Sequence, residues 1–558
     1  MESQRSFFII VFLIVSFILW KIWDDEHHIN LLNIENNHST LQPYSIQSHE
    51  SNQNTPITHT NNPYSHIITI KTDVFLLKIN TYSGNIEEAY LNNYQENLNS
   101  QKPLKLLHTS KENKYQAYID IETLNEYFTN DLNQKNKKHY LYYSNTTNQC
   151  EYILKNNENK LQFDLTYQGP NNIIYTKRYL LNRNDYSIYI TYIIDNQSTY
   201  PIHIKLYGNL IQSIHSDVIQ SKHNDHCPLY TYQEAAYSTD TEKYQKYNLK
   251  DIKHTNLNIH STNGWIALLQ KYFIIALLPI TPKDNTFYTT YLNNHDISIG
   301  FKSDFIHIPP GKKNELQSIL WMGPKIQDNM KLVAPNLDLV IDYGWLWFIS
   351  HPLFKLLQFI HTYTIDNWGI SIILITVIIR LIMYPLTKAQ YTSMAKIRML
   401  QPKLISIQEE YKHDKYQYHQ KTIELYKKEK VNPLGGCLPL LIQMPIFLAL
   451  YYMLSESVEL RHAKFAFWIK DLSDQDPYYI LPIIMGITMF FIQKLSPTTI
   501  TDPIQKKIMN IMLVIFTIFF LWFPSGLVLY YIISNIITII QQQVIYHDLS
   551  KKGLHNKK

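Results

Sequence analysis

Cysteine is scarce in this sequence. The chain has 558 residues but only three cysteines, Cys150, Cys227 and Cys437. So few cysteines exclude a fold built on disulfides. Cys437 falls in an apolar segment, which leaves Cys150 and Cys227 as the one candidate pair. A chain of this length does not need a disulfide to stabilise its core, so this pairing stays open.

Signatures of catalysis are also missing. No phosphate-binding loop of the form GxxxxGK[ST] occurs in the chain, and no spaced pair of carboxylates suits glycoside chemistry. The His-Asn-Asp-His-Cys cluster at 223–227 has no matching second half of a zinc site, so a polar loop is expected there. A net charge of +5 does not by itself indicate a nucleic-acid partner. We therefore expect no cofactor, no metal site and no catalytic residue.

Apolar residues are distributed unevenly along the chain. The mean hydropathy is slightly negative, yet the last third carries long apolar runs, so at least two folding units are expected. The chain also opens with an apolar segment that ends in Trp20–Trp23 and is followed by acids. A cleaved signal peptide would carry a small-x-small site, which is absent here. Residues 1–23 are therefore predicted to be an uncleaved transmembrane anchor with a cytoplasmic N-terminus.

Strand patterns follow a polar segment at 24–63, which is expected to be a flexible linker. Alternation over Tyr186–Ile194 places Ile188, Ile190, Tyr192 and Ile194 on one face. The apolar stretch Trp265–Pro279 is interrupted by Gln270 and Lys271, so two buried strands are expected rather than a membrane span. Residues 64–335 are predicted to form a large all-β sandwich, and an exported carbohydrate enzyme is a rival interpretation of this region.

The segment at 336–365 is amphipathic and aromatic. Tryptophans and apolar residues alternate there with His351, Lys355 and His361, and Pro352 lies among them. This pattern predicts a helix lying along the outer membrane surface. The alternative is a core helix of the sandwich, which the adjacent membrane span disfavours.

Five apolar spans follow, within a core domain predicted at 366–545. They are Trp368–Tyr384, Cys437–Leu454, Tyr478–Ile492, Ile508–Phe523 and Leu527–Ile540. Several are short for a hydrocarbon core of about 30 Å. The loop after the first span and the tail at 546–558 are basic, which predicts that both are cytoplasmic. The fold class is therefore a membrane α-helical bundle of six transmembrane helices, five of them forming the core, plus a large periplasmic β-sandwich.

The basic loop at 387–432 has an internal pattern. Ile397, Leu400, Leu404, Ile407 and Tyr411 follow a heptad spacing, and a reversal at 413–414 predicts an antiparallel helical hairpin. Its basic face suits either anionic lipid or ribosomal RNA.

Polar residues inside the spans form stripes. Thr376, Arg380 and Tyr384 are four residues apart and share one helix face. Other polar positions in the spans are Gln443, Asn510, Thr517, Tyr530, Tyr531, Ser534, Asn535, Thr538 and Gln541. An arginine at mid-span costs roughly 2.5–3.5 kcal/mol on insertion scales, so Arg380 should face water or a partner. The stripe favours a wet cavity; the alternative is that Arg380 extends to the cytoplasmic boundary.

Four sequence strings identify a family resemblance. Met383–Gln390 (MYPLTKAQ), Asn432–Cys437 (NPLGGC), Gln443–Phe447 (QMPIF) and Phe523–Tyr531 (FPSGLVLYY) resemble the bacterial YidC membrane protein insertase family. The likeness spans nearly the whole chain and is strongest after Lys331.

The resemblance implies a hydrophilic groove enclosed by five helices, open to cytoplasm and lipid but closed outside. Arg380 would supply the charge of this groove. Thr376, Met444, Pro445, Tyr530 and Tyr531 would line the path of the substrate, with Gln443, Asn510, Thr517, Ser534 and Thr538 as further polar lining. The sandwich would resemble sugar-mutarotase folds without being catalytic, and part of it would face the Sec translocon.

The expected partners are nascent membrane proteins, the Sec translocon, membrane lipids and the ribosome. The runner-up function is a polytopic secondary transporter with a periplasmic binding domain. Such transporters usually show inverted repeats and broken helices, which this sequence does not show. Deletion of most of residues 64–330 would spare an insertase and would inactivate an exported enzyme.

Overall fold

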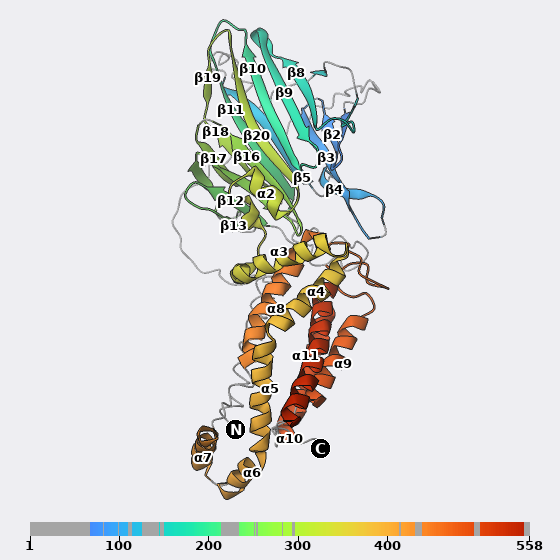
Figure 1. The fold of residues 1–558 in the computed structure, drawn as a ribbon. Coiled ribbons are helices and arrows are strands. Elements are labelled where there is room, and N and C mark those ends of the chain that lie inside the picture. The colour runs from blue at the N-terminus through green and yellow to red at the C-terminus, as the bar shows by residue number, and fades with distance from the viewer. Residues whose placement is uncertain are drawn as a thin grey trace, which may run out of the picture. The chain divides into compact units, whose positions relative to one another are not determined.

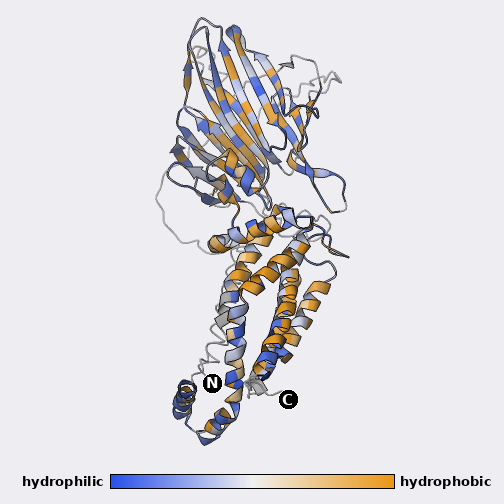
Figure 2. Cartoon of the chain, in the orientation of Figure 1, coloured by the Kyte–Doolittle hydropathy of each residue, from blue (hydrophilic) through white to orange (hydrophobic). Residues whose placement is uncertain are grey.

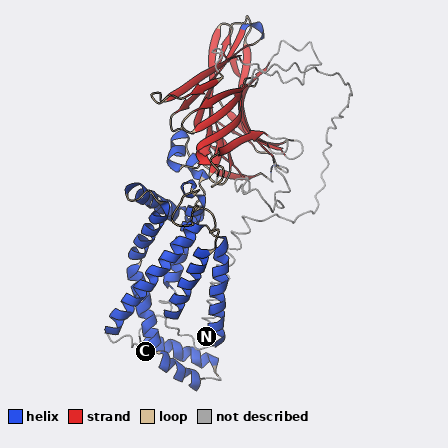
Figure 3. Cartoon of the chain, turned by 90° about the vertical axis from the view of Figure 1, so that its right-hand side faces the viewer, coloured by secondary structure: helices blue, strands red, loops and turns tan. Residues whose placement is uncertain are grey.

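A computed structural model describes residues 67–213 and 234–551. Short gaps within these ranges lie at 82, 99, 110–113, 125–143, 146–149, 250–251, 253–254, 282, 293–295, 412–413, 430–437 and 496–502. The expected anchor, the linker and the cluster at 223–227 lie outside the described residues. So does Cys227, so its pairing with the exposed Cys150 stays untested. The described residues form a region of strands and a region of helices (Figure 3), and the strands precede the main helices in the sequence.

The first sheet has eleven strands in the described part of the chain. Its order is β14-β17-β18-β11-β5-β4-β3-β2-β1-β7, and β19 pairs with β11 beside this path. The strands are β1 (Ile67–Lys71), β2 (Phe75–Asn80), β3 (Asn85–Gln95), β4 (Pro103–Thr109), β5 (Lys114–Leu124), β7 (Glu151–Ile153), β11 (Ile202–Ser213), β14 (Asn258–Ser261), β17 (Asn285–Tyr291), β18 (Asp296–Ser303) and β19 (Ile306–Ile308).

The second sheet has nine described strands in the order β13-β12-β15-β16-β20-β10-β9-β8-β6. They are β6 (Ser144–Asn145), β8 (Lys160–Gln168), β9 (Ile173–Asn182), β10 (Ser187–Asn196), β12 (Glu234–Thr239), β13 (Gln245–Asn248), β15 (Gly264–Leu269), β16 (Phe273–Ile280) and β20 (Lys312–Pro324).

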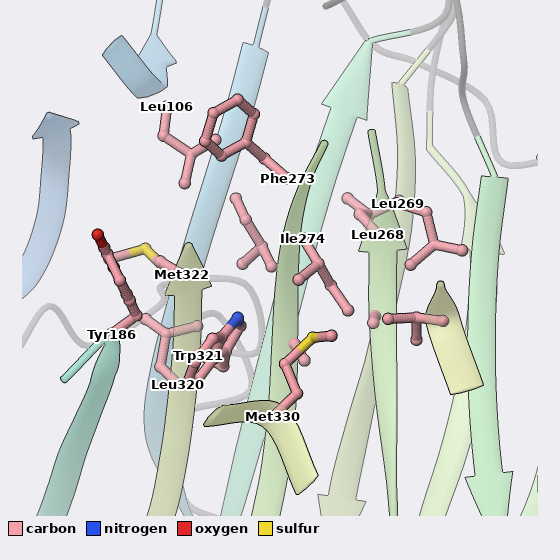
Figure 4. Packing of buried hydrophobic residues seen from close by; sticks show 14 of the residues in the cluster. Leu106, Tyr186, Leu268, Leu269, Phe273, Ile274, Leu320, Trp321, Met322 and Met330 are labelled. Atoms are coloured by element: carbon pink, nitrogen blue, oxygen red, sulfur yellow. The ribbon is translucent and has the colours of Figure 1, made fainter. Parts of the chain in front are cut away.

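The core of the sandwich comes from alternating strand residues, as the sequence predicted. Ile188, Ile190, Tyr192 and Ile194 of β10 are all buried. The stretch at 265–279 forms β15 and β16, whose residues are mostly buried, which confirms two strands instead of a membrane span. Phe273, Trp321 and Met330 lie in one hydrophobic cluster from β16, β20 and the short helix α2 (Gln327–Val333) (Figure 4). The all-β prediction for this region is therefore confirmed.

A buried cation, Lys177, lies between the two sheets of the sandwich. Lys177 of β9 is fully buried, and its Nζ donates to Asn85 Oδ1 at 2.7 Å and to the carbonyl of Ile119 at 2.8 Å. It also lies over the rings of Tyr179 and Tyr192, 5.5 and 5.2 Å from their centroids. These contacts connect the two sheets, because Asn85 and Ile119 belong to the first sheet and Lys177 to the second.

The C-terminal region is helical. Its elements are α3 (Trp347–Tyr363), α4 (Trp368–Ile382), α5 (Tyr384–Met399), α6 (Gln401–Glu410), α7 (Lys415–Lys428), α8 (Leu438–Glu456), α9 (Ile480–Leu495), α10 (Pro503–Phe519) and α11 (Ser525–Lys551), and 3₁₀ turns precede α3 and follow α8 and α10. Helices α4, α9 and α10 are predominantly apolar (Figure 2).

Only part of the helical region passes a length and hydropathy test for a membrane span. Among the described residues, α11 alone is long and apolar enough, and α4 with α5 would make a second span if that bent pair crosses as one. The two helices of this pair meet at an angle of 58°. Pro385 lies in the first turn of α5, where its missing N–H and ring favour such a break. Tyr384 therefore begins α5 and does not extend the helix of Thr376 and Arg380, contrary to the predicted stripe.

A second, smaller hydrophobic cluster joins α5 to α11. Tyr391 and Ala395 of α5 are buried against Ile545 and Leu549 of α11. This packing buries residues at the start of the expected hairpin (387–432) and of the expected tail (546–558). The separate unit begins at Leu400 and includes α6 and α7, whose antiparallel arrangement is shown by the 2.7 Å ion pair between Lys403 and Glu429.

Contacts join the sandwich to the outer ends of the helices. The buried Lys325, just after β20, lies 3.7 Å from the carboxylate of Glu456 at the end of α8. Arg461, after α8, donates to the carbonyl of Gln95 in β3 at 2.8 Å. Helix α3 buries Phe354 and Leu357 and exposes Trp347 and Phe359, which fits the amphipathic helix predicted there.

Candidate functional site

Helix α4 carries the arginine that the sequence singled out. The helix starts at Trp368 because the side chain of Asn367 caps it and accepts the N–H of Ile370 at 3.2 Å. Its apolar run then continues to Arg380, which lies in the last turn. A cation in the last turn of a helix is stabilised by the negative end of the helix dipole.

The guanidinium of Arg380 is held by α11. Its Nε donates to Ser534 Oγ at 2.7 Å, and one terminal nitrogen donates to the same oxygen. Gln541, two turns further along α11, donates its side-chain N–H to the carbonyl of Arg380 at 3.1 Å. A β-carbon on Gly526 of α11 would lie 3.3 Å from Ile372 of α4. The two helices therefore run in the same direction, with Arg380 at the level of Ser534.

Arg380 has no acidic partner among the described residues. Among the described ion pairs of the membrane helices and their connecting loops, carboxylates lie beside Lys388, His361 and His462, but none lies beside Arg380. Ser534 is a neutral acceptor and occupies two of the five N–H donors of the guanidinium. The positive charge is thus positioned but not neutralised by the described protein.

Helix α8 contributes a second polar contact to the same face of α11. Gln443 donates from its side chain to the hydroxyl of Tyr530 at 2.9 Å, and Tyr530 is almost fully buried. The ring of Tyr531 packs against Phe447 and Phe520, with centroids 5.9 and 5.2 Å apart. The structure therefore brings together Arg380, Ser534, Tyr530 and Gln443 from three helices that are distant in the sequence.

Other predicted positions are satisfied within their own helices. The hydroxyls of Thr376, Thr517 and Thr538 each donate to the carbonyl four residues earlier. Thr376 is also fully buried. Asn510 accepts from Gln493 at 2.9 Å, in an exposed contact between α9 and α10. Met444 and Pro445 are half-buried beside Gln443 on α8. None of these side chains contacts Arg380 through a hydrogen bond in the described structure.

The loop between α8 and α9 covers the N-terminal ends of α4 and α11. The backbone N–H groups of Ser525 and Gly526 donate to Asp474 and Leu472, and Asn367 donates to the carbonyl of Phe465. Asp476 is buried and accepts from Trp468 Nε1 at 3.0 Å and from Leu481 N at 2.7 Å. Sequence reasoning missed this role of the loop.

Comparison with known families covers both parts of the chain. The model of the 60Kd inner membrane protein family matches residues 359–552, and the model of the YidC periplasmic domain matches residues 67–356. The fold and these matches define an inner membrane protein with a helical membrane region and a periplasmic β domain. The chain belongs to the YidC family, whose function is membrane protein insertion.

Solved structures are similar to the chain at low identity. A crystal structure of an active YidC insertase with its first transmembrane domain resolved is 20% identical, covers 86% of this chain and 92% of that one, and has a TM-score of 0.37. A galactose mutarotase-like protein from Clostridium acetobutylicum is 9% identical over 46% of this chain and 94% of its own, with a TM-score of 0.31. A putative aldose 1-epimerase from Escherichia coli K12 is 12% identical over 46% and 99%, with a TM-score of 0.29.

Proposed function

We propose that this insertase passes hydrophobic segments of nascent membrane proteins into the bilayer along the polar face formed by α4, α8 and α11. The observation that supports this path is Arg380, which is fixed by Ser534 and has no carboxylate partner among the described residues. Tyr530, Tyr531, Gln443, Met444 and Pro445 lie on the same helices and would contact the passing segment. Asn510, Thr517 and Thr538 would be further lining, and the buried Thr376 and Tyr530 would reach the segment only if the helices move apart.

The charge of Arg380 suits a particular step of insertion. An acidic residue in the short tail ahead of a hydrophobic segment would provide the carboxylate that Arg380 lacks, and Arg binds carboxylates through two parallel hydrogen bonds. The attraction would be transient, because the tail must leave the arginine on the outer side. A fixed carboxylate within the protein would compete with this step.

The free energy for insertion comes from the substrate. A segment of about 20 apolar residues gains roughly 6–12 kcal/mol on entering the hydrocarbon core. This gain offsets the transfer of a short polar tail, so no nucleotide hydrolysis by this chain is required. The YidC family is not an enzyme class, and we propose no catalytic residue or cofactor for this chain.

The proposed membrane arrangement has six transmembrane helices with both termini in the cytoplasm. Helices α4 and α11 run in the same direction, as this arrangement requires. Apolar side chains of α9 and α10 are exposed in the described structure, including Ile487, Phe490, Ile511 and Ile515, and would face lipid. The basic residues of α6 and α7 would contact anionic lipid or the ribosome, and the sandwich would face the Sec translocon.

Complementation of an insertase-depleted bacterium tests this function. Wild type should restore insertion of a membrane protein with a short acidic tail, and Arg380→Ala should fail on that substrate. Arg380→Lys keeps the charge but loses the fork of donors, so intermediate activity is expected. Arg398→Ala, at the end of α5, is the matched loss of an arginine outside the site.

The outcomes are distinguishable. Rescue by wild type and by Arg380→Ala alike would retain the insertase function and remove the proposed role of Arg380. Rescue by neither protein, with both stably expressed, would contradict the function itself and favour a transporter.

A further inference from the structure

Two histidines face each other on neighbouring strands of the sandwich. His203 lies on β11 and His307 on β19, two strands labelled in Figure 1, and the antiparallel register places the two residues directly opposite one another. The Nδ1 atom of His307 is 3.1 Å from the Nε2 atom of His203. The two ring planes are inclined at 50°, so the rings meet through their nitrogen-bearing edges and do not stack face to face.

This spacing matches a pair of metal ligands. Imidazole nitrogens bind Zn²⁺ at about 2.0–2.1 Å, so nitrogens 3.1 Å apart subtend about 95–102° at a shared ion. That angle lies between the 90° of neighbouring ligands in a square plane and the 109° of a tetrahedron. An ion at this angle would lie to one side of the line joining the two nitrogens, so both imidazole rings would turn to direct their lone pairs at it.

The histidine pair is accessible to solvent, and the nearest cation on β11 is paired with a carboxylate. His307 is exposed and His203 is half-buried. The nearest cation along β11 is Lys205, whose ammonium is 3.0 Å from the carboxylate of Glu122 and 4.7 Å from the ring centroid of Phe305. Glu122 largely neutralises this lysine. Neutral imidazole is the form of histidine that binds a metal ion.

We infer that His203 and His307 form a two-histidine site for a divalent transition metal, with Cu²⁺ bound most tightly. No third His, Cys, Asp or Glu of the described residues joins them. A closed structural zinc site, which needs four ligands, is thus excluded for these residues. Two cis imidazoles with water in the remaining positions suit Cu²⁺ or Ni²⁺, and Cu²⁺ leads the affinity order of divalent metals.

The ion would fasten a short strand to the sheet. Strand β19 has three residues and pairs with β11 through them alone. The two histidines are 104 residues apart in the chain, so the metal would close a long loop. Neither histidine lies in a sequence motif, which explains why the sequence analysis expected no metal site.

The test uses the full chain in detergent, purified without a polyhistidine tag and with His223→Gln and His226→Gln to remove the competing cluster. Cu²⁺ is titrated, and the nitrogens bound to the ion are counted by electron paramagnetic resonance. Two nitrogens are expected, and His307→Ala should reduce them to one and weaken binding at least about tenfold. His260→Ala is the matched control, because His260 is exposed on the same sandwich but bonds Thr286 and no second histidine.

Several results would overturn the site. One is an unchanged Cu²⁺ affinity in both His307→Ala and His203→Ala, and another is a spectrum with one nitrogen before either substitution. His307→Gln gives a second variant if the alanine protein fails to fold. Zn²⁺ or Mn²⁺ binding more tightly than Cu²⁺ would also contradict the inference.

Discussion

The sandwich holds a fully buried cation, Lys177, and the helical core holds a partly buried one, Arg380, and their surroundings differ. Lys177 in the sandwich makes two hydrogen bonds and lies over two aromatic rings. Arg380 in the helical core is held by one serine hydroxyl, and three of its N–H donors have no partner among the described residues. Removing either charge from water costs free energy. The difference in their partners therefore indicates that the two charges have different roles.

Lys177 is satisfied by the protein itself. Burial lowers the pKa of Lys177 to about 8, and the nearby carboxylate of Asp120 offsets part of this effect. Tyr192 donates to that carboxylate at 3.0 Å and to the carbonyl of Ile119 at 3.1 Å. The group connects the two sheets and leaves little capacity for an outside ligand, so its role is structural.

Arg380 is held in position, but part of its hydrogen-bonding capacity is not used by the described residues. Ser534 fixes the guanidinium, and Gln541 fixes the backbone beneath it. Arg380 is partly buried, and an ionisable residue within a membrane segment is costly unless its charge acts on a partner or a water-filled cavity. The comparison therefore favours a structural role for Lys177, whereas the partly unpaired charge of Arg380 supports the substrate contact proposed above.

The largest effect on stability is expected for Lys177→Ala. Removing the ammonium leaves Asp120, Asn85 and the Ile119 carbonyl without their buried partner, which costs about 3–5 kcal/mol. The unfolding free energy of the sandwich, followed by near-ultraviolet circular dichroism in urea, should fall by this amount. Arg380→Ala should leave this transition unchanged.

The pH dependence of the same transition provides a second test. Because the folded pKa of Lys177 is about 8 and its ordinary value is 10.5, the unfolded chain binds the proton more tightly. Stability should therefore rise as the pH increases from 8 towards 10.5, and this rise should be absent in Lys177→Ala. Equal loss of stability in Lys177→Ala and Arg380→Ala would remove the distinction between the two cations.

The sandwich was more predictable from sequence than the helical site. Strand alternation identified the inward face of β10 correctly. The same rule applied to β9 would have placed Lys177 on the inward face with Tyr175 and Tyr179, so the signal for the buried lysine was present. A charged residue in a strand usually faces water, so the sequence analysis did not identify Lys177 as buried.

The helical site depends on contacts that no local pattern contains. The spacing of α4 correctly placed Thr376 and Arg380 on one face, but the break before Pro385 removed Tyr384 from it. The pairing of Arg380 with Ser534 spans 154 residues and depends on how α4 and α11 are aligned. Sequence periodicity predicts which residues share a helix face, but it does not predict how two helices are aligned along their axes.

An intermediate, purely functional effect is expected for Ser534→Ala. The guanidinium keeps its charge but loses the acceptor that positions it, so insertion of acidic-tailed substrates should fall severalfold, less than in Arg380→Ala. Thr538→Ser is the control, because the Thr538 hydroxyl bonds only the carbonyl of Ser534 on its own helix and serine can do the same. Insertion is measured by protease protection of the substrate tail. Activity equal to wild type would show that Ser534 does not position Arg380.

The smallest effect is expected at the surface of the sandwich, where Glu88 is held by Lys105 and Lys78 at 2.7 and 2.8 Å. Burial alone would raise the pKa of Glu88, but the hydrogen bonds from these lysines lower it to about 2. The stabilisation is therefore complete above pH 4.5 and is lost as the pH falls towards 2. Glu88→Gln should cost less than about 1 kcal/mol at pH 7 in urea unfolding, and less still near pH 2, since partly exposed ion pairs contribute little. Glu87→Gln is the matched control, because Glu87 accepts from Asn80 and has no lysine partner among the described ion pairs. A loss at Glu88 as large as that at Lys177 would mean that exposed ion pairs, and not the buried cation, hold the sandwich together.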